Sequence, residues 1–163
     1  MENKIVLSPA EETSIKLDGN FDQNSYSKNL KLALFKSLAM DTKISDEIKF
    51  MSGMSGRKYR YLINNLVSSI NNPRYLEIGS WAGSTVCSAL YGNEAKAVCI
   101  DNWLKFETEE YLKKVYNTKD QKKEFEINTK KIITEKIDFK FIESDFRKVN
   151  FNHLGKFNIY CYD

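Results

Sequence analysis

The sequence predicts an α/β fold in which parallel strands form one sheet and helices flank it. Residues 74–101 carry most of this prediction, because they read as a strand, a glycine-containing turn, a helix and a second strand that ends in an acid. Two further short apolar runs follow, at residues 139–142 and 157–163. Parallel strands joined by one helix form a right-handed unit whose ligands lie at the carboxyl ends of the strands. We therefore expect the functional site at that end of the sheet.

The composition is that of one globular domain. The chain has 163 residues, of which 42% are hydrophobic and 13% are aromatic, enough for a substantial core. The net charge is only +3, and the lysines that follow residue 104 alternate with glutamates. This alternation is typical of a solvated helix surface rather than of a surface that follows phosphates. The sequence therefore predicts no nucleic-acid partner.

The cysteines and the N-terminus indicate a cytoplasmic protein. Cys87, Cys99 and Cys161 are scattered through predicted helix and strand, as small core residues in a reducing compartment are, and they lack metal-ligand spacing. The N-terminus lacks the basic and then apolar pattern of a secretion signal. No stretch approaches the length of a membrane span. We therefore expect no metal bound by these cysteines and no membrane contact.

Helices are expected before the first strand. Residues 1–25 are polar and predict an N-terminal arm, whereas residues 26–163 are expected to form the domain. Leucines at helical spacing predict an amphipathic helix over residues 26–40. A second helical pattern runs over residues 59–70 and is stopped by the Asn-Asn-Pro that follows. These helices would form an N-terminal extension that covers one face of the sheet.

The first strand leads into the turn on which the functional prediction depends. Tyr75–Ile78 is a short apolar run, as in a strand buried on both faces. Gly79 and Gly83 bracket the turn, and the Ser-Thr pair after it is expected to cap the next helix. Asp101 ends the second strand, 22 residues after Gly79. A separation of about 20 residues brings an acid onto a ribose hydroxyl in nucleotide-binding units of this type.

Two residues count against a dinucleotide at this turn. A dinucleotide site needs a second glycine where this chain has Trp81, because backbone amides must approach a pyrophosphate closely. Glu77 adds negative charge just before the turn. That charge is unfavourable beside a pyrophosphate and favourable beside an ammonium or sulfonium cation. The turn therefore favours a positively charged adenosyl ligand.

The pattern Glu77-x-Gly79-x-x-x-Gly83 resembles the first motif of the class I S-adenosylmethionine-dependent methyltransferases. A narrower subgroup of methyltransferase-like proteins is also similar at residues 53–56, 58–60 and 74–79. The resemblance implies a Rossmann-like sheet with its first four strands in the order 3-2-1-4. It implies S-adenosyl-L-methionine as cofactor and a small molecule as methyl acceptor. The family sheet has seven strands, so the domain is expected to be incomplete at its C-terminus.

The resemblance also implies where the cofactor meets the chain. Glu77 would face its methionine amino group, the glycine turn would pass under its methionine portion, and Asp101 would bond its ribose hydroxyls. Asp163, at the end of the fourth strand, would be the catalytic residue, where the family has an acid that faces the methyl group as general base, metal ligand or substrate anchor. No residue is assigned to a metal. The residues implied to bind the cofactor are Glu77, Gly79, Ser80, Trp81, Gly83, Asp101, Asn102, Trp103, Asp145 and Phe146.

Several of these assignments have structural alternatives. In the family reading Trp103 and Phe146 flank adenine and Asp145 meets its amino group. An indole at this point can instead pack under the next helix, and an aspartate here can cap a short helix. His153 lies in a connecting loop, which is typical of a surface histidine. The Gly53–Gly56 segment predicts a turn into a helix or, beside a cofactor cleft, a lid.

The fourth strand raises the question of a partner. It would form an edge of the sheet carrying Ile159, Tyr160 and Tyr162, and an edge with unpaired amides invites another strand. We expect either the N-terminal segment or the same strand of a second copy, in a homodimer, to cover it. The alternative to an enzyme is a truncated module that binds S-adenosylmethionine or S-adenosylhomocysteine without turnover.

Overall fold

The structure is a computed structural model, and it describes residues 24–103 and 120–162. The predicted N-terminal arm therefore lies almost entirely outside the described residues, as do Asp163 and the segment between the second strand and the last helix. The helices are α1 (Ser25–Leu38), α2 (Asp46–Lys49), α3 (Arg57–Ser69), α4 (Ser84–Leu90) and α6 (Gln121–Ile132), the strands are β1 (Arg74–Ile78), β2 (Ala95–Asp101), β3 (Ile137–Glu143) and β4 (Ile159–Tyr162), and two single-turn 3-10 helices are η1 (Phe146–Lys148) and η2 (Phe151–His153).

The four strands form one parallel sheet in the order β3-β2-β1-β4. Leu76 of β1 lies between Val98 of β2 and Tyr160 of β4, so the first strand in the sequence lies inside the sheet. This arrangement confirms the predicted α/β, Rossmann-like fold and its strand order. It also places the ends of β1 and β2, with Gly79 and Asp101, side by side at the carboxyl edge of the sheet.

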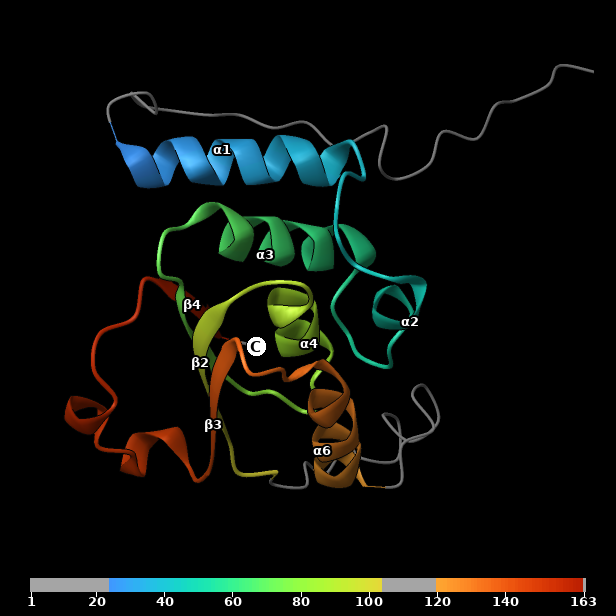
Figure 1. The fold of residues 1–163 in the computed structure, drawn as a ribbon. Coiled ribbons are helices and arrows are strands. Elements are labelled where there is room, and N and C mark those ends of the chain that lie inside the picture. Colours follow the sequence, from blue (N-terminus) through green and yellow to red (C-terminus); the bar gives the residue numbers. More distant parts are fainter. Residues whose placement is uncertain (1–23, 104–119, 163) are drawn as a thin grey trace, which may run out of the picture.

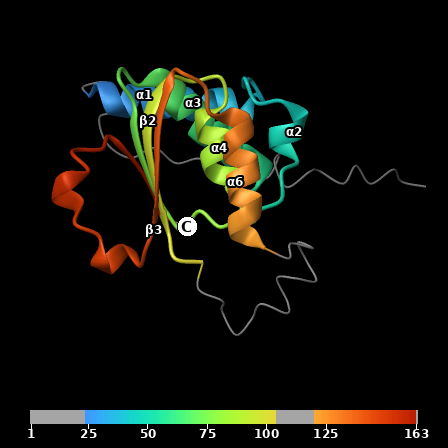
Figure 2. The same ribbon diagram turned by 60° about the horizontal axis from the view of Figure 1, so that its bottom comes forward.

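The helices lie on one face of the sheet (Figure 1). Helices α3, α4 and α6 cover that face, and α1 stacks on α3 as an outer layer, which forms the predicted N-terminal helical extension. Figure 2 views the sheet nearly edge-on and shows the segment with η1 and η2 on the opposite face. The core is accordingly divided into two clusters, one on each side of the sheet.

Helix α1 begins at Ser25, one residue before the predicted start. The side chain of Asn24 caps it by accepting a hydrogen bond of 2.8 Å from the Tyr26 amide. Helix α1 is attached to α3 by polar contacts as well as by packing. The side-chain amide of Asn65 donates to Ser37 Oγ at 3.1 Å and to the Asp41 carbonyl at 2.8 Å.

The predicted cap of α4 is wrong by one residue. The helix begins at Ser84, and its N-cap is Gly83, in the left-handed conformation with φ of +86°. The Ser84 hydroxyl is instead directed toward the segment before α3, where it lies 3.3 Å from Ser55 Oγ. At the other end of α4, Gly92 has φ of +66°, as expected of a residue that terminates a helix.

The larger core cluster lies between the sheet and the helices, with Tyr75, Leu90 and Phe125 among its fully buried residues. All three cysteines are buried in this cluster and none forms a disulfide within the described residues, in agreement with their prediction as core residues. Burial, and after it the Coulomb effect of Glu77, raises the pKa of the Cys87 and Cys99 thiols. These thiols are therefore protonated at neutral pH.

The two edges of the sheet differ in charge. The β3 edge presents Asp138, Lys140 and Glu143 to solvent, and such charges discourage pairing with another strand. The β4 edge has no charged residue within Ile159–Tyr162, and Tyr160 and Tyr162 are 58% and 62% exposed. The second copy expected at this edge stays a prediction, which the mass of the particle in solution would test.

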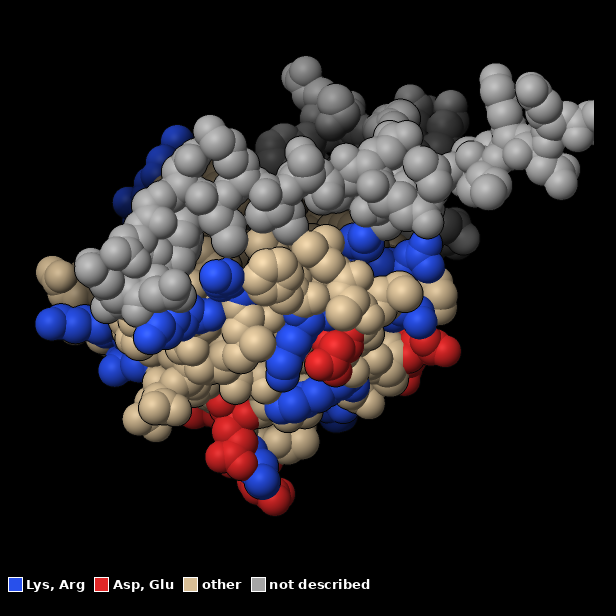
Figure 3. All heavy atoms as spheres, turned by 90° about the horizontal axis from the view of Figure 1, so that it is seen from above, with Lys and Arg blue, Asp and Glu red and all other residues tan. Residues whose placement is uncertain are grey.

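The charged surface on the α1 side is mixed. Figure 3 shows lysine and arginine side chains at several separate places among uncharged residues, with acidic side chains beside some of them. Among the helices that the structure describes, none combines the length and the apolar character needed to cross a membrane.

Candidate cofactor-binding site

The predicted turn follows β1 and has an unusual backbone. Gly79, Trp81 and Gly83 all have positive φ, of +84°, +44° and +86°. The Gly83 amide closes the turn by donating to the Ser80 carbonyl at 2.7 Å. A Cβ atom at Gly83 would lie 3.0 Å from the ring of Phe125, so both backbone conformation and space require glycine there.

The Asp101 carboxylate holds this turn in place. Its Oδ2 accepts hydrogen bonds from the Ser80 amide at 2.7 Å and from the Trp81 amide at 2.8 Å. Its Oδ1 accepts from the Trp103 amide at 2.8 Å. A carboxylate offers about four acceptor positions, and three are used here. Asp101 therefore organises this turn and the start of the segment after β2, and the described residues leave one of its acceptor positions unused.

Trp103 is packed into the core between β3 and α6. Its ring meets those of Phe125 and Phe141 edge-on, with centroid separations of 5.4 and 5.0 Å. Its indole Nε1 donates to the Trp81 carbonyl at 3.0 Å. This is the packing alternative foreseen from the sequence, although the helix it meets is α6. The contact of Trp103 with adenine stays a prediction.

Glu77 lies on the helix side of the sheet and is fully enclosed, with 0% of its surface exposed. In the sheet register it stands between Cys99 of β2 and Cys161 of β4. The Tyr75 hydroxyl donates a hydrogen bond to Glu77 Oε2. Burial first, and the Glu77 charge second, raises the pKa of Tyr75 well above its usual range, so this hydroxyl keeps its proton.

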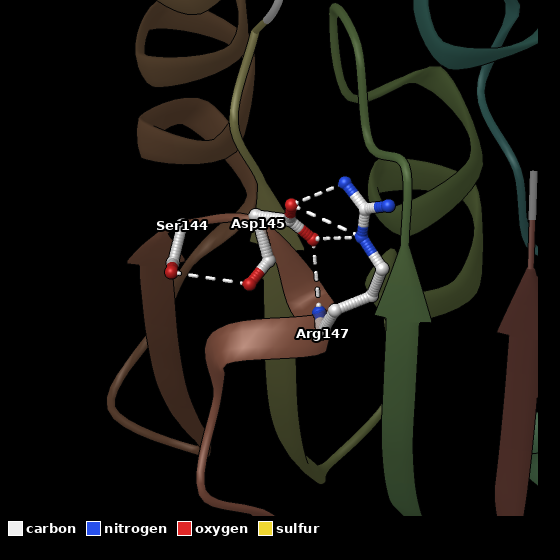
Figure 4. A network of polar contacts seen from close by, with 3 residues as sticks. All are labelled: Ser144, Asp145 and Arg147. Carbon is white, nitrogen blue, oxygen red and sulfur yellow. Dashed lines mark hydrogen bonds and ion pairs between the residues drawn. The ribbon is translucent and has the colours of Figure 1, made fainter.

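Asp145 follows β3 and is occupied by its neighbour Arg147 (Figure 4). Its Oδ1 accepts from the Arg147 amide at 3.0 Å, which caps η1, and from Arg147 Nε at 2.9 Å. The side-chain hydrogen bond from Arg147, followed by the backbone one, lowers the pKa of Asp145 to about 2. This is the capping alternative foreseen from the sequence. The predicted contact with adenine is untested.

The remaining predicted residues lie around this end of the sheet. Phe146 meets Tyr162 edge-on at 5.8 Å and packs against the smaller core cluster. Asn102 is half-buried between the two bonded residues Asp101 and Trp103. The predicted catalytic residue, Asp163, lies outside the described residues. His153 is exposed in η2, as expected of a surface histidine.

The structure joins some of these residues and separates others. One hydrogen-bonded network contains the turn, Asp101 and Trp103. The Ser144 amide donates to the Asp101 carbonyl at 2.9 Å, which brings the end of β3 beside this network. The Asp145 carboxylate, however, is directed at Arg147 (Figure 4).

Sequence reasoning missed Arg60, which organises the segment before α3. Its side chain is 3% exposed although it is a cation, and burial lowers its pKa. Its position in the same helical stripe as buried Ile63, Asn64 and Val67 is the signal that could have revealed it. The guanidinium donates to the carbonyls of Ile48, Lys49, Met51, Gly53 and Ser55 and to Ser55 Oγ, at 2.7 to 3.4 Å.

The segment that Arg60 holds packs tightly against the start of α4. A Cβ atom at Gly53 would lie 2.0 Å from Ser84 Oγ, so only glycine allows this approach. Cys87 of α4 lies within electrostatic reach of both Arg60 and Glu77. The Gly53–Gly56 segment therefore lies against the first turn of α4, at Ser84.

Among the described residues, no group of three or more His, Cys, Asp or Glu side chains is arranged to hold a metal ion. Comparisons of the chain with family models, curated proteins and solved structures find no match.

Proposed function

We propose that this chain is a class I S-adenosylmethionine-dependent methyltransferase that acts on a small molecule in the cytoplasm. The observation that carries the proposal is the carboxylate of Asp101 at the end of β2, bonded to the backbone of a turn that has Trp81 at its centre. The parallel sheet order supports it, because ligands of such sheets lie at the carboxyl ends of the strands.

The turn supports an adenosyl ligand over a dinucleotide. The amides of Ser80 and Trp81 both donate to Asp101, so they are engaged within the protein and are not directed at a phosphate. A ribose, by contrast, offers hydroxyl donors that suit the remaining acceptor position of Asp101.

The Glu77 carboxylate fits the ammonium group of the methionine portion in charge, but the fit requires a movement. The side chain is fully enclosed, so binding has to open a path to it. The Gly53–Gly56 segment lies against Ser84 at the start of α4 and receives hydrogen bonds from a single side chain, Arg60. In this proposal the segment acts as the lid foreseen from the sequence.

The chemistry asks little of the protein beyond positioning. The bound sulfonium supplies a methyl group that is already electrophilic, so the chain must orient it and exclude water. Asp101 and the turn would fix the adenosyl end, and Glu77 would fix the amino end. The Asp163 carboxylate is the proposed general base near the acceptor, where it would take a proton from an acceptor that arrives protonated.

Calorimetric titration with S-adenosylmethionine, S-adenosylhomocysteine and NAD tests the proposal. We expect the two adenosyl ligands to bind and NAD not to bind. Asp101→Ala should weaken adenosyl binding by about 1.5–3 kcal/mol, the value of a hydrogen bond to a charged group. Asp138→Ala is the matched control, because Asp138 is an exposed acid on β3 that pairs with Lys96.

The proposal would be overturned if NAD binds and S-adenosylmethionine does not. It would also be overturned if Asp101→Ala and wild type bind the adenosyl ligands with equal affinity. Adenosyl binding without methyl transfer to any member of an acceptor panel would instead favour the binding module without turnover. Binding and turnover assays on one protein preparation therefore distinguish a methyltransferase from a binding module without turnover.

A further inference from the structure

A buried pair of polar side chains lies beneath the candidate site and is not explained by packing alone. Tyr75 and Glu77 are two residues apart in β1, so the alternation of a strand places both on the same face. Both are 0% exposed, and the Tyr75 hydroxyl donates to Glu77 Oε2. A buried carboxylate in the middle of a sheet costs free energy, which apolar residues at these positions would not.

From this pair we infer that Tyr75 is a positioning residue: it orients the Glu77 carboxylate so that the second oxygen, Oε1, receives the amino group of the ligand. The inference rests on the proposed function and deepens it. It assigns a role to a residue that would otherwise count only as core.

The surroundings of the pair favour orientation over a general structural role. The flanking positions in the register are Cys99 and Cys161, whose short side chains leave the carboxylate rotation to be fixed by another group. Tyr75 is such a group, because its ring is rigid and anchored in the core. The hydroxyl keeps its proton at neutral pH, so it can only donate to a carboxylate beside it.

The same arrangement predicts which ligand feature Tyr75 controls. Its hydroxyl is bonded to Glu77 and not to the Asp101 network that would hold the ribose. Loss of the hydroxyl should therefore weaken the binding of ligands that carry the amino group of the methionine portion. The binding of adenosyl ligands that lack that amino group should be unchanged. A merely structural role would weaken both classes alike.

Calorimetry on Tyr75→Phe with two ligands provides the test. S-adenosylhomocysteine carries the α-amino group of its amino acid portion. Methylthioadenosine keeps adenine and ribose but lacks that α-amino group. We expect Tyr75→Phe to lose about tenfold in affinity for S-adenosylhomocysteine and to bind methylthioadenosine as wild type does. Tyr61→Phe is the matched control, since Tyr61 is another buried tyrosine, on α3, and both affinities should stay unchanged.

The outcomes separate the inference from the proposed function. Wild-type protein that binds neither ligand overturns the proposed function, and the inference falls with it. If wild type binds both and Tyr75→Phe loses neither or loses both equally, only the inference is overturned. If Tyr75→Phe fails to fold, a crystal structure of the wild-type protein with S-adenosylhomocysteine decides. An amino nitrogen bonded to Glu77 Oε1, with Tyr75 on Oε2, supports the inference, and an amino nitrogen bonded elsewhere overturns it.

Discussion

Asp101 and Asp145 are acids that follow neighbouring strands, yet the chain uses them differently. Among the described residues, the Asp101 carboxylate accepts its hydrogen bonds from backbone amides, and those amides belong to two segments that are about 20 residues apart in sequence. Asp145 accepts from the backbone and the side chain of Arg147, two residues away. The first acid therefore joins distant parts of the chain, and the second stabilises one local turn. Position after a strand does not by itself distinguish the two uses.

The largest expected effect comes from removing the acid that joins distant segments. Asp101→Ala leaves the amides of Ser80, Trp81 and Trp103 without their acceptor, and water can replace it only in part. We expect a loss of about 3 kcal/mol in the free energy of unfolding, measured by urea denaturation followed by circular dichroism. If the midpoint equals that of wild type, the three hydrogen bonds do not organise the turns as described.

A smaller effect is expected from the glycine that completes the turn. Gly83→Ala places a side chain on a left-handed backbone and presses it against Phe125, so we expect a loss of about 2 kcal/mol in the same assay. Gly56→Ala is the matched control, because Gly56 has φ of −69° and open space where its Cβ would lie. Equal stability of the two variants would contradict the tight approach of Phe125.

The smallest effect is expected at Asp145, and its pH dependence identifies its source. The pKa of this carboxyl is about 2 in the folded protein and 3.8 ordinarily, so its stabilisation is present above pH 3.8 and is lost as the pH falls toward 2. The difference in Tm between wild type and Asp145→Asn should therefore be constant from pH 7 to about 5, shrink as the pH falls below 3.8, and vanish only as the pH falls through about 2.

Arg147→Ala should reproduce this pH profile, because it removes the same ion pair. A Tm difference that persists unchanged near pH 2 would show that Asp145 acts as a neutral cap and not through its charge. Asp145→Asn should also lower affinity for S-adenosylhomocysteine less than Asp101→Ala does. A larger affinity loss in Asp145→Asn than in Asp101→Ala would instead support the contact between Asp145 and adenine that the family resemblance implies.

The sequence predicted the fold well because local patterns determine it. Apolar runs of strand length, each followed by a turn or a helical stripe, are enough to predict a parallel sheet. The cap of α4 was predicted at the Ser-Thr pair because serine is a good cap by propensity. The structure uses Gly83 instead, since the turn ends in a left-handed conformation and Ser84 is directed toward Ser55.

The site could be predicted only in part. The position of Asp101 follows from spacing, and its nearness to the turn is observed. The environment of Trp103 could not be predicted, because its partners Phe125 and Phe141 come from later segments whose packing no local pattern specifies. The pair of Tyr75 and Glu77 could have been found from strand alternation alone, which places them on one face.

The chain contains only two tryptophans, Trp81 and Trp103, and one donates its indole hydrogen to the carbonyl of the other. Ultraviolet emission from this protein is therefore dominated by indoles that belong to a single place, the carboxyl ends of β1 and β2. A change in the wavelength or intensity of this emission on addition of a small molecule would report binding at that place without any attached dye. The polypeptide thus contains an intrinsic fluorescent reporter for binding at this end of the sheet.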